Sequence, residues 1–130
     1  MNEDIEKVIA EFFQKRVRDR ISFLLSSKKR GDLFGKIAHA AEEYIDRALI
    51  IRKDEQLIEQ DTIRKYLGRR VYVIAQNSPL DGEFADFGEA LELWGCGVPY
   101  LLYGNGYLYV ETEYDHSAHT AYILKGRDIT

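Results

Sequence analysis

The sequence predicts an α+β domain in which two or three N-terminal helices pack on a C-terminal, mainly antiparallel sheet. Apolar residues recur at helical spacing in the first half, and a β-branched run followed by an Asn-Gly turn marks the second half. A chain of 130 residues is the size of one domain. We therefore expect a single domain over 1–130, with a helical half over 1–68 and a mainly β half with one short helix over 69–130.

Apolar residues repeat every three or four positions through the first half of the chain, which is typical of amphipathic helices. The pattern predicts one helix over about 3–26 and a second over about 32–49, where Asp32 is a suitable N-cap. The segment 54–67 predicts a third helix closed by Gly68, although part of it is also compatible with an edge strand.

The second half begins with RVYVIA at 70–75, whose β-branched residues predict a buried strand. Aromatic and aliphatic residues at helical spacing over 84–94 then predict a short helix. Asn105-Gly106 lies between two apolar runs and predicts a hairpin turn, because both central residues of this turn need positive φ. A loop further along returns the chain once more, so we expect a meander over about 98–125.

Pairing the strands across Asn105-Gly106 places Tyr103 opposite Leu108. If the second loop has four residues, Val110 lies opposite Ala121. Alternate side chains then separate into two faces. One is a core face: Leu101, Tyr103, Leu108, Val110, Ala121 and Ile123. The other is rich in tyrosine: Tyr100, Leu102, Tyr107, Tyr109, Tyr122 and Leu124, with Glu111 and Glu113 further along.

Charge is unevenly distributed along the chain. No Lys or Arg occurs between Val71 and Leu124, a stretch with eight acidic residues, whereas residues 1–70 hold 16 basic and 13 acidic residues. This split predicts an acidic surface that attracts a basic partner, with tyrosines as contact residues. The expected partner-binding residues are Glu89, Glu92, Tyr100, Tyr107, Tyr109, Glu111, Glu113 and Tyr122. The alternative interpretation is that these acids are scattered over different faces of an ordinary domain.

The leading hypothesis is a small non-enzymatic protein that binds or inhibits a basic protein. Immunity and antitoxin-type inhibitors share this general character: they are small, acidic, poor in cysteine and without catalytic motifs. A nuclease-type toxin is therefore a possible partner. The net charge of −4 argues against direct nucleic-acid binding. No phosphate loop, nucleophile elbow or zinc-protease motif is found, and no cofactor is expected.

Two alternatives stay open. Asp115, His116 and His119 lie close together in the sequence and could form a metal or catalytic site, although their spacing matches no known metal motif. The tyrosine face could instead pack against a second copy of the chain in a homodimer. A single cysteine, a charged N-terminus and no long apolar run favour a cytoplasmic protein without a membrane span.

Overall fold

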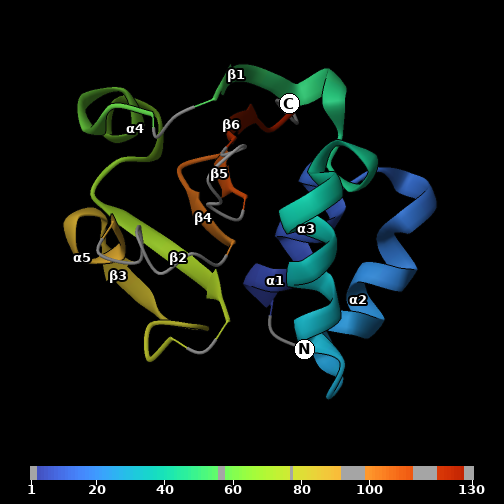
Figure 1. The fold of residues 1–130 in the computed structure, drawn as a ribbon. Helices are drawn as coiled ribbons and strands as arrows, with labels where there is room; N and C mark the ends of the chain where they lie inside the picture. Colours follow the sequence, from blue (N-terminus) through green and yellow to red (C-terminus); the bar gives the residue numbers. More distant parts are fainter. Residues whose placement is uncertain (1–2, 56–57, 77, 92–98, 113–119, 128–130) are drawn as a thin grey trace.

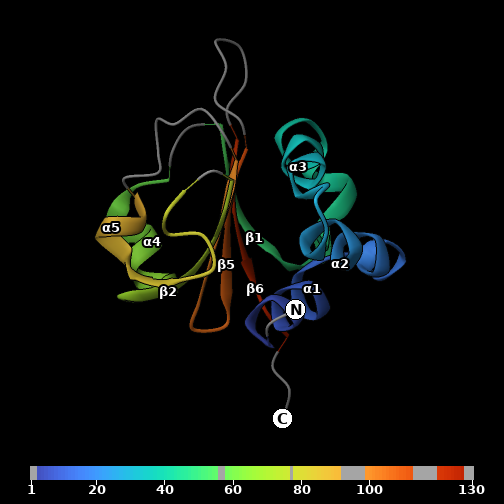
Figure 2. The same cartoon turned by 90° about the horizontal axis from the view of Figure 1, so that it is seen from below.

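The protein has an α+β fold in which helices cover both faces of a six-stranded antiparallel sheet (Figures 1 and 2). The computed structural model describes residues 3–55, 58–76, 78–91, 99–112 and 120–127. Viewed along the sheet, α1, α2 and α3 lie on one side and α4 and α5 on the other (Figure 2). The fold class predicted from the sequence is therefore confirmed.

The helices are α1 (Glu3–Phe12), α2 (Arg18–Ser26), α3 (Arg30–Tyr44), α4 (Gln60–Leu67) and α5 (Phe87–Leu91), with 3₁₀ turns η1 (Lys15–Val17) and η2 (Arg47–Leu49). The strands are β1 (Ile50–Asp54), β2 (Arg70–Ala75), β3 (Phe84–Asp86), β4 (Tyr100–Gly104), β5 (Tyr107–Glu111) and β6 (Ala121–Lys125). Their order across the sheet is β1-β6-β5-β4-β2-β3, so β1 and β3 are the edge strands.

The first helix does not run unbroken over 3–26 as predicted, because the chain leaves the helix at Phe13 and Gln14. Phe13 forms a β-bridge with Ile45, and the Gln14 N–H donates to the Tyr44 carbonyl at 2.8 Å. The Gln14 side-chain amide also donates to the Glu42 and Ile45 carbonyls, both at 3.1 Å. These bonds to a distant segment hold Gln14 in an extended conformation, with φ −60° and ψ 139°.

Gln14→Ala is expected to lower the free energy of unfolding by about 2 kcal/mol. The substitution removes the two part-buried hydrogen bonds that the side-chain amide donates, each worth about 1 kcal/mol, and leaves two carbonyls without these partners. The third bond, which Gln14 Oε1 accepts from Arg16 Nε at 3.1 Å, is exposed and adds little. Urea unfolding measures the difference. Lys15→Ala, at an exposed neighbouring position, is the control and should change stability by less than about 0.5 kcal/mol. Equal losses in the two variants would contradict this role of Gln14.

The second predicted helix, over 32–49, is also too long, because α3 ends at Tyr44 and Ile45 turns extended. Asp46 then caps η2 by accepting a hydrogen bond from the Ala48 N–H at 3.1 Å. Residues 50–54 form β1, which pairs with β6 at the edge of the sheet. The third predicted helix is confirmed only as α4, which ends at Gly68 with a φ of 78°. Pairing with β6 therefore forms a strand in a segment that the sequence had assigned to no element, apart from Asp54 at the start of the third predicted helix.

The short helix predicted over 84–94 divides into two elements. Phe84–Asp86 is β3, paired with β2, and only Phe87–Leu91 is helical. Residues 92–94 lie outside the described part of the chain. Phe84 therefore does not belong to a buried helical stripe, and its side chain is 47% exposed at the sheet edge.

The hairpin predicted at Asn105-Gly106 is confirmed. Both residues have positive φ, at 50° and 80°, and Tyr103 lies opposite Leu108. The pairing of β5 with β6 differs by one residue from the prediction, since Val110 lies opposite Tyr122 and not opposite Ala121.

The loop that we expected to have four residues lies within 113–119, outside the described residues, and the observed register excludes the predicted pairing of Val110 with Ala121. The backbone N–H of Thr112 donates to the Thr120 carbonyl at 3.0 Å, so the two strands are joined beyond this pair by residues 113–119. This shift moves every β6 side chain to the opposite face from the predicted one. Ala121 and Ile123 therefore lie on the tyrosine-rich face, and Tyr122 and Leu124 lie on the other face.

Both faces of the sheet are buried. The face with Leu101, Leu108, Val110 and Tyr122 packs on α1, α2 and α3, where the Phe12 and Tyr103 rings meet at 5.8 Å. The tyrosine-rich face packs on α4 and α5, and there the Tyr66 and Tyr107 rings meet at 5.2 Å. The tyrosine-rich face is thus the floor of a second core.

Candidate functional site

The structure separates the residues that the sequence assigned to one partner-binding surface. Tyr100, Tyr109 and Glu111 are buried on the α4 and α5 side of the sheet, and Tyr122 is buried on the other side. Tyr107 is half-buried and Glu89 is exposed. Glu92 and Glu113 lie outside the described residues. The expectation of a tyrosine-rich contact surface is therefore corrected for the four buried residues, because their side chains cannot reach a partner in this fold.

Glu111 is part of a buried polar cluster with two tyrosines. The Tyr109 hydroxyl donates to Glu111 Oε2 at 2.9 Å, and the Tyr100 and Tyr109 rings are 6.0 Å apart. Burial raises the pKa of Glu111 to about 7, while the hydroxyls of Tyr100 and Tyr109 act in the opposite direction. Burial also raises the pKa of both tyrosines, so their hydroxyls stay protonated, although only the Tyr109 hydroxyl makes a hydrogen bond within the described residues. This cluster is a polar part of the core.

Tyr122 connects three elements on the opposite face. Its hydroxyl donates to Glu42 Oε2 of α3 at 2.9 Å, and Lys53 Nζ of β1 lies 2.6 Å from the same oxygen. The hydrogen bond from Lys53, followed by that from Tyr122, lowers the pKa of Glu42. The Tyr122 side chain therefore holds the first helical layer to the sheet edge.

Three exposed acidic residues instead lie close together in the chain, along β3 and the start of α5. We define the β3 patch as Glu83, Phe84, Asp86 and Glu89, all of which are exposed. Asp81 is nearby in sequence but already engaged, since it accepts from Arg30 at 2.6 Å and from the Ala75 N–H at 3.0 Å. The β3 patch thus combines three carboxylates and an aromatic ring at or next to the edge strand β3, whose place in the fold Figure 1 shows. Arg64 and Arg69 line a small pocket together with Asp86.

Phe84 is the aromatic centre of this patch. The Arg70 guanidinium lies 4.4 Å from the centre of its ring, and the Tyr72 ring meets it edge-on at 5.2 Å. Attraction between a guanidinium and an aromatic face is electrostatic. The patch therefore already holds one arginine of the chain itself, and about half of the ring stays exposed.

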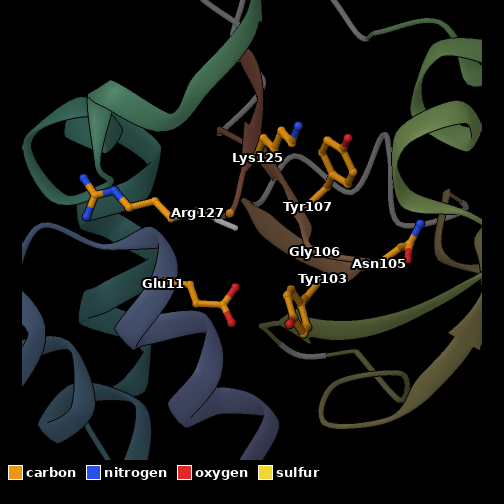
Figure 3. Close-up of a pocket in the computed structure, with 8 residues that line it drawn as sticks. Glu11, Tyr103, Asn105, Gly106, Tyr107, Lys125 and Arg127 are labelled. Carbon is orange, nitrogen blue, oxygen red and sulfur yellow. The ribbon is translucent and has the colours of Figure 1, made fainter. Parts of the chain in front are cut away.

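A cavity of about 500 Å³ lies at the opposite end of the hairpin from Tyr100 and Glu111 (Figure 3). Three segments form it: the last turn of α1, the β4–β5 turn and the residues that follow β6. Its lining residues are Glu11, Tyr103, Asn105, Gly106, Tyr107, Lys125, Gly126 and Arg127. Among these, only Tyr107 belongs to the partner-binding residues predicted from the sequence.

Glycine at position 126 is needed for this geometry. The Gly126 N–H donates to the Gly106 carbonyl at 2.8 Å, which closes the end of the hairpin. A Cβ at Gly126 would lie 3.0 Å from Glu11 Oε2 and 3.0 Å from that carbonyl. The bare α-carbon thus allows the Glu11 carboxylate to lie over the strand end. The sequence around Gly126 gives no signal for this feature, because α1, which meets it, lies at the other end of the chain.

The metal or catalytic alternative cannot be placed, since Asp115, His116 and His119 lie outside the described residues. Within the described ranges, no three His, Cys, Asp or Glu side chains gather in a way that would hold a metal ion. No helix in those ranges is both long and apolar enough to cross a bilayer. Comparison with protein-family models, curated proteins and solved structures gives no match. The functional argument therefore depends on the chemistry of the surface.

Proposed function

We propose that the protein is a small non-enzymatic binding protein, of the immunity or antitoxin type, whose β3 patch engages a basic protein. One observation carries the proposal: Glu83, Asp86 and Glu89 are exposed and lie within five residues of the half-exposed Phe84 in the chain. The patch lies within the stretch from Val71 to Leu124 that contains no Lys or Arg. A nuclease-type toxin as the partner and a cytoplasmic location are parts of this proposal.

The physical basis is charge complementarity around an aromatic contact. Clustered carboxylates attract a positively charged surface and accelerate its association. An exposed aromatic ring adds contact area at a small entropic cost, and it accepts an arginine on its face. The Arg70 contact with Phe84 shows this chemistry within the chain. Phe84 therefore takes the role that the sequence interpretation had given to the tyrosines.

No observation favours the two alternatives to the same degree. A homodimer through the tyrosine-rich face would have to displace α4 and α5, which already cover Tyr100 and Tyr109. At the far edge of the sheet, β1 carries an irregularity between Ile50 and Arg52, and its exposed positions include charged residues. Bulges and charges of this kind oppose pairing between sheet edges. These features leave the β3 patch as the better-supported contact surface.

The triple variant Glu83→Lys, Asp86→Lys, Glu89→Lys is expected to bind the partner at least about a hundredfold more weakly. Each reversal replaces an attraction with a repulsion, and tenfold in affinity corresponds to about 1.4 kcal/mol. Affinity capture from the native cell extract identifies the partner, and titration of the purified partner at several salt concentrations measures the affinity. Wild-type binding should weaken steeply as salt rises.

A second triple variant, Glu6→Lys, Glu43→Lys, Glu55→Lys, has the same net charge and is the matched control. Its three positions are exposed and lie on other elements. It should keep most of the wild-type affinity. If both variants bound the partner equally weakly, the loss of affinity would come from net charge alone, and the role of the β3 patch would be overturned. Nuclease activity of the eluted partner, inhibited when the wild-type protein is added back, would support the immunity-type function, and a captured partner that is not inhibited would contradict it.

A further inference from the structure

A second cavity lies where the segment between α1 and η1 crosses the segment between α3 and η2. The two segments are joined by the antiparallel β-bridge of Phe13 with Ile45. The N–H of Gln14 donates across this bridge at 2.8 Å, and that of Asp46 donates back at 2.7 Å. A local twofold axis therefore relates them: in each segment a helix ends, the next residue forms the bridge, and a 3₁₀ turn begins two residues later.

We define the bridge cavity as the space of about 330 Å³ that is lined by Gln14, Lys15, Asp46, Arg47 and Ala48. Lys15 and Arg47 are the first residues of the two 3₁₀ turns, so the local symmetry places one cation at each end of the cavity. Gln14 and Asp46 are extended, and at about 3.3 Å per residue the α-carbons of the two cations are roughly 13 Å apart along the bridge. Lysine and arginine have long, flexible stems, so both side chains reach a group bound between them.

The two cations are unpaired in the described part of the chain, where the side chains of Lys15 and Arg47 make no ion pair or hydrogen bond. The acid in the cavity wall is already engaged. Asp46 Oδ1 accepts from the Ala48 N–H at 3.1 Å, and Asp46 Oδ2 accepts from the Arg127 guanidinium at 3.0 Å. Figure 3 shows the Arg127 side chain directed away from the cavity drawn there. Arg127 therefore compensates the charge of Asp46, and the bridge cavity keeps the two positive charges.

A third cation is held at the rim of the bridge cavity. Arg16 Nε donates to Gln14 Oε1 at 3.1 Å, and Arg16 Nη2 donates to the Glu43 carbonyl at 2.9 Å. Both acceptors are neutral, so they fix the guanidinium without cancelling its charge. Two acids of α3 are near in the chain: the Glu42 carboxylate is bonded to Lys53, and Glu43 is exposed. Positive charge is therefore in excess at this junction.

The excess of positive charge limits the occupant. Two like charges in one cavity repel each other, and an anion bound between them removes this repulsion. A metal ion or an amine would be repelled by both ends of the cavity. A phosphate monoester carries nearly two negative charges at neutral pH, and arginine binds two of its oxygens at once. The cavity volume is near the lower end of the range of about 300–1,000 Å³ for small-molecule sites, so a small organic group fits beside the phosphate.

We propose that the bridge cavity binds a phosphate dianion, either free or at the end of a small phosphomonoester. The Arg47 guanidinium donates to two phosphate oxygens from one end of the cavity, and the Lys15 ammonium donates to a third oxygen from the other end. Arg16 adds positive charge at the rim. The site shares no residue with the β3 patch, so it adds a small-molecule function to the proposed protein binding.

Isotope-edited NMR titration of the wild-type protein tests the proposal with inorganic phosphate, glycerol 3-phosphate and dimethyl phosphate as probes, at an ionic strength held constant with sodium chloride. Phosphate and glycerol 3-phosphate should cause saturable shifts at the amides of Lys15, Arg16 and Arg47. Dimethyl phosphate carries a single charge and should bind at least about tenfold more weakly. Tighter binding of the ester than of phosphate would assign a phosphomonoester as the ligand, and the reverse or equal affinities would assign free phosphate. No saturable shift with either dianion up to about 20 mM, or equally tight binding of dimethyl phosphate, would overturn the proposal.

The double variant Lys15→Gln, Arg47→Gln should bind the tighter of the two dianions at least about tenfold more weakly than the wild type does. The matched control is Arg20→Gln, Lys28→Gln, which has the same net charge and changes two exposed residues outside the cavity. This control should keep its affinity within about twofold. If both double variants lost affinity equally, net charge alone would attract the anion and the assignment would be overturned. The β3-patch triple variant should still show the shifts at Lys15 and Arg47, which separates this test from that of the proposed function.

Discussion

Gly104→Ala is expected to destabilise the protein by about 3 kcal/mol, at the upper end of the usual cost of overpacking. Gly104 is the last residue of β4, and a Cβ there would lie 2.5 Å from the Leu67 carbonyl oxygen. It would also lie 3.1 Å from the Arg70 carbonyl oxygen and from Val71 Cγ1. Two of these three atoms belong to the backbone that joins α4 to β2, so relief requires the helix to move away from the sheet. Urea unfolding of wild type and variant measures the loss.

Gly35→Ala is the matched control, since Gly35 lies within α3 and no atom comes within 4 Å of a Cβ built there. Alanine loses less backbone entropy than glycine on entering a helix, so this variant should be more stable than wild type by about 0.5–1 kcal/mol. Opposite signs for the same substitution are the expected result. A Gly104→Ala variant as stable as wild type would show that α4 does not approach β4 this closely.

The parts of the fold that the sequence predicted well are those decided by local chemistry. Asn105-Gly106 accepts the positive φ that a tight hairpin needs, so the turn and the β4–β5 register could be predicted. The β-branched run at 70–75 forms β2, which is largely buried and pairs with β4 on one side and β3 on the other, as its composition indicates. The break at Gln14 could not be predicted, because its partners Glu42 and Ile45 lie about thirty residues away.

For the candidate sites, too, the sequence indicates what depends on local composition but not what depends on the fold. The absence of Lys and Arg between Val71 and Leu124 is visible in the sequence, but which acids reach the surface depends on the fold. Glu83 and Glu111 have the same side chain, yet one is exposed and the other is 3% exposed. The predicted register of β6 differed from the observed one by a single residue, and this error placed Tyr122 on the wrong face of the sheet. The cavity of Figure 3 joins three segments far apart in the chain, so no local pattern could indicate it.

Glu111→Gln is expected to stabilise the protein relative to wild type as the pH rises. Burial raises the pKa of Glu111 from 4.5 to about 7 in the folded state. Between these pH values the folded protein holds a proton that the unfolded chain has lost, so the stability of the wild type falls as pH rises through this window and levels off above it. One pKa unit corresponds to about 1.4 kcal/mol, so the total loss is roughly 3 kcal/mol.

Glutamine has no charge to desolvate and still accepts the hydrogen bond from the Tyr109 hydroxyl. The stability difference between Glu111→Gln and wild type should therefore shift by roughly 3 kcal/mol in favour of the variant from pH 4.5 to about pH 8. Denaturant unfolding at several pH values measures this shift. Glu83→Gln, at an exposed position, should show a shift smaller than about 0.5 kcal/mol. A pH-independent difference for Glu111→Gln would mean that the carboxyl ionises as it does in water, which is incompatible with its burial beneath α4 and α5.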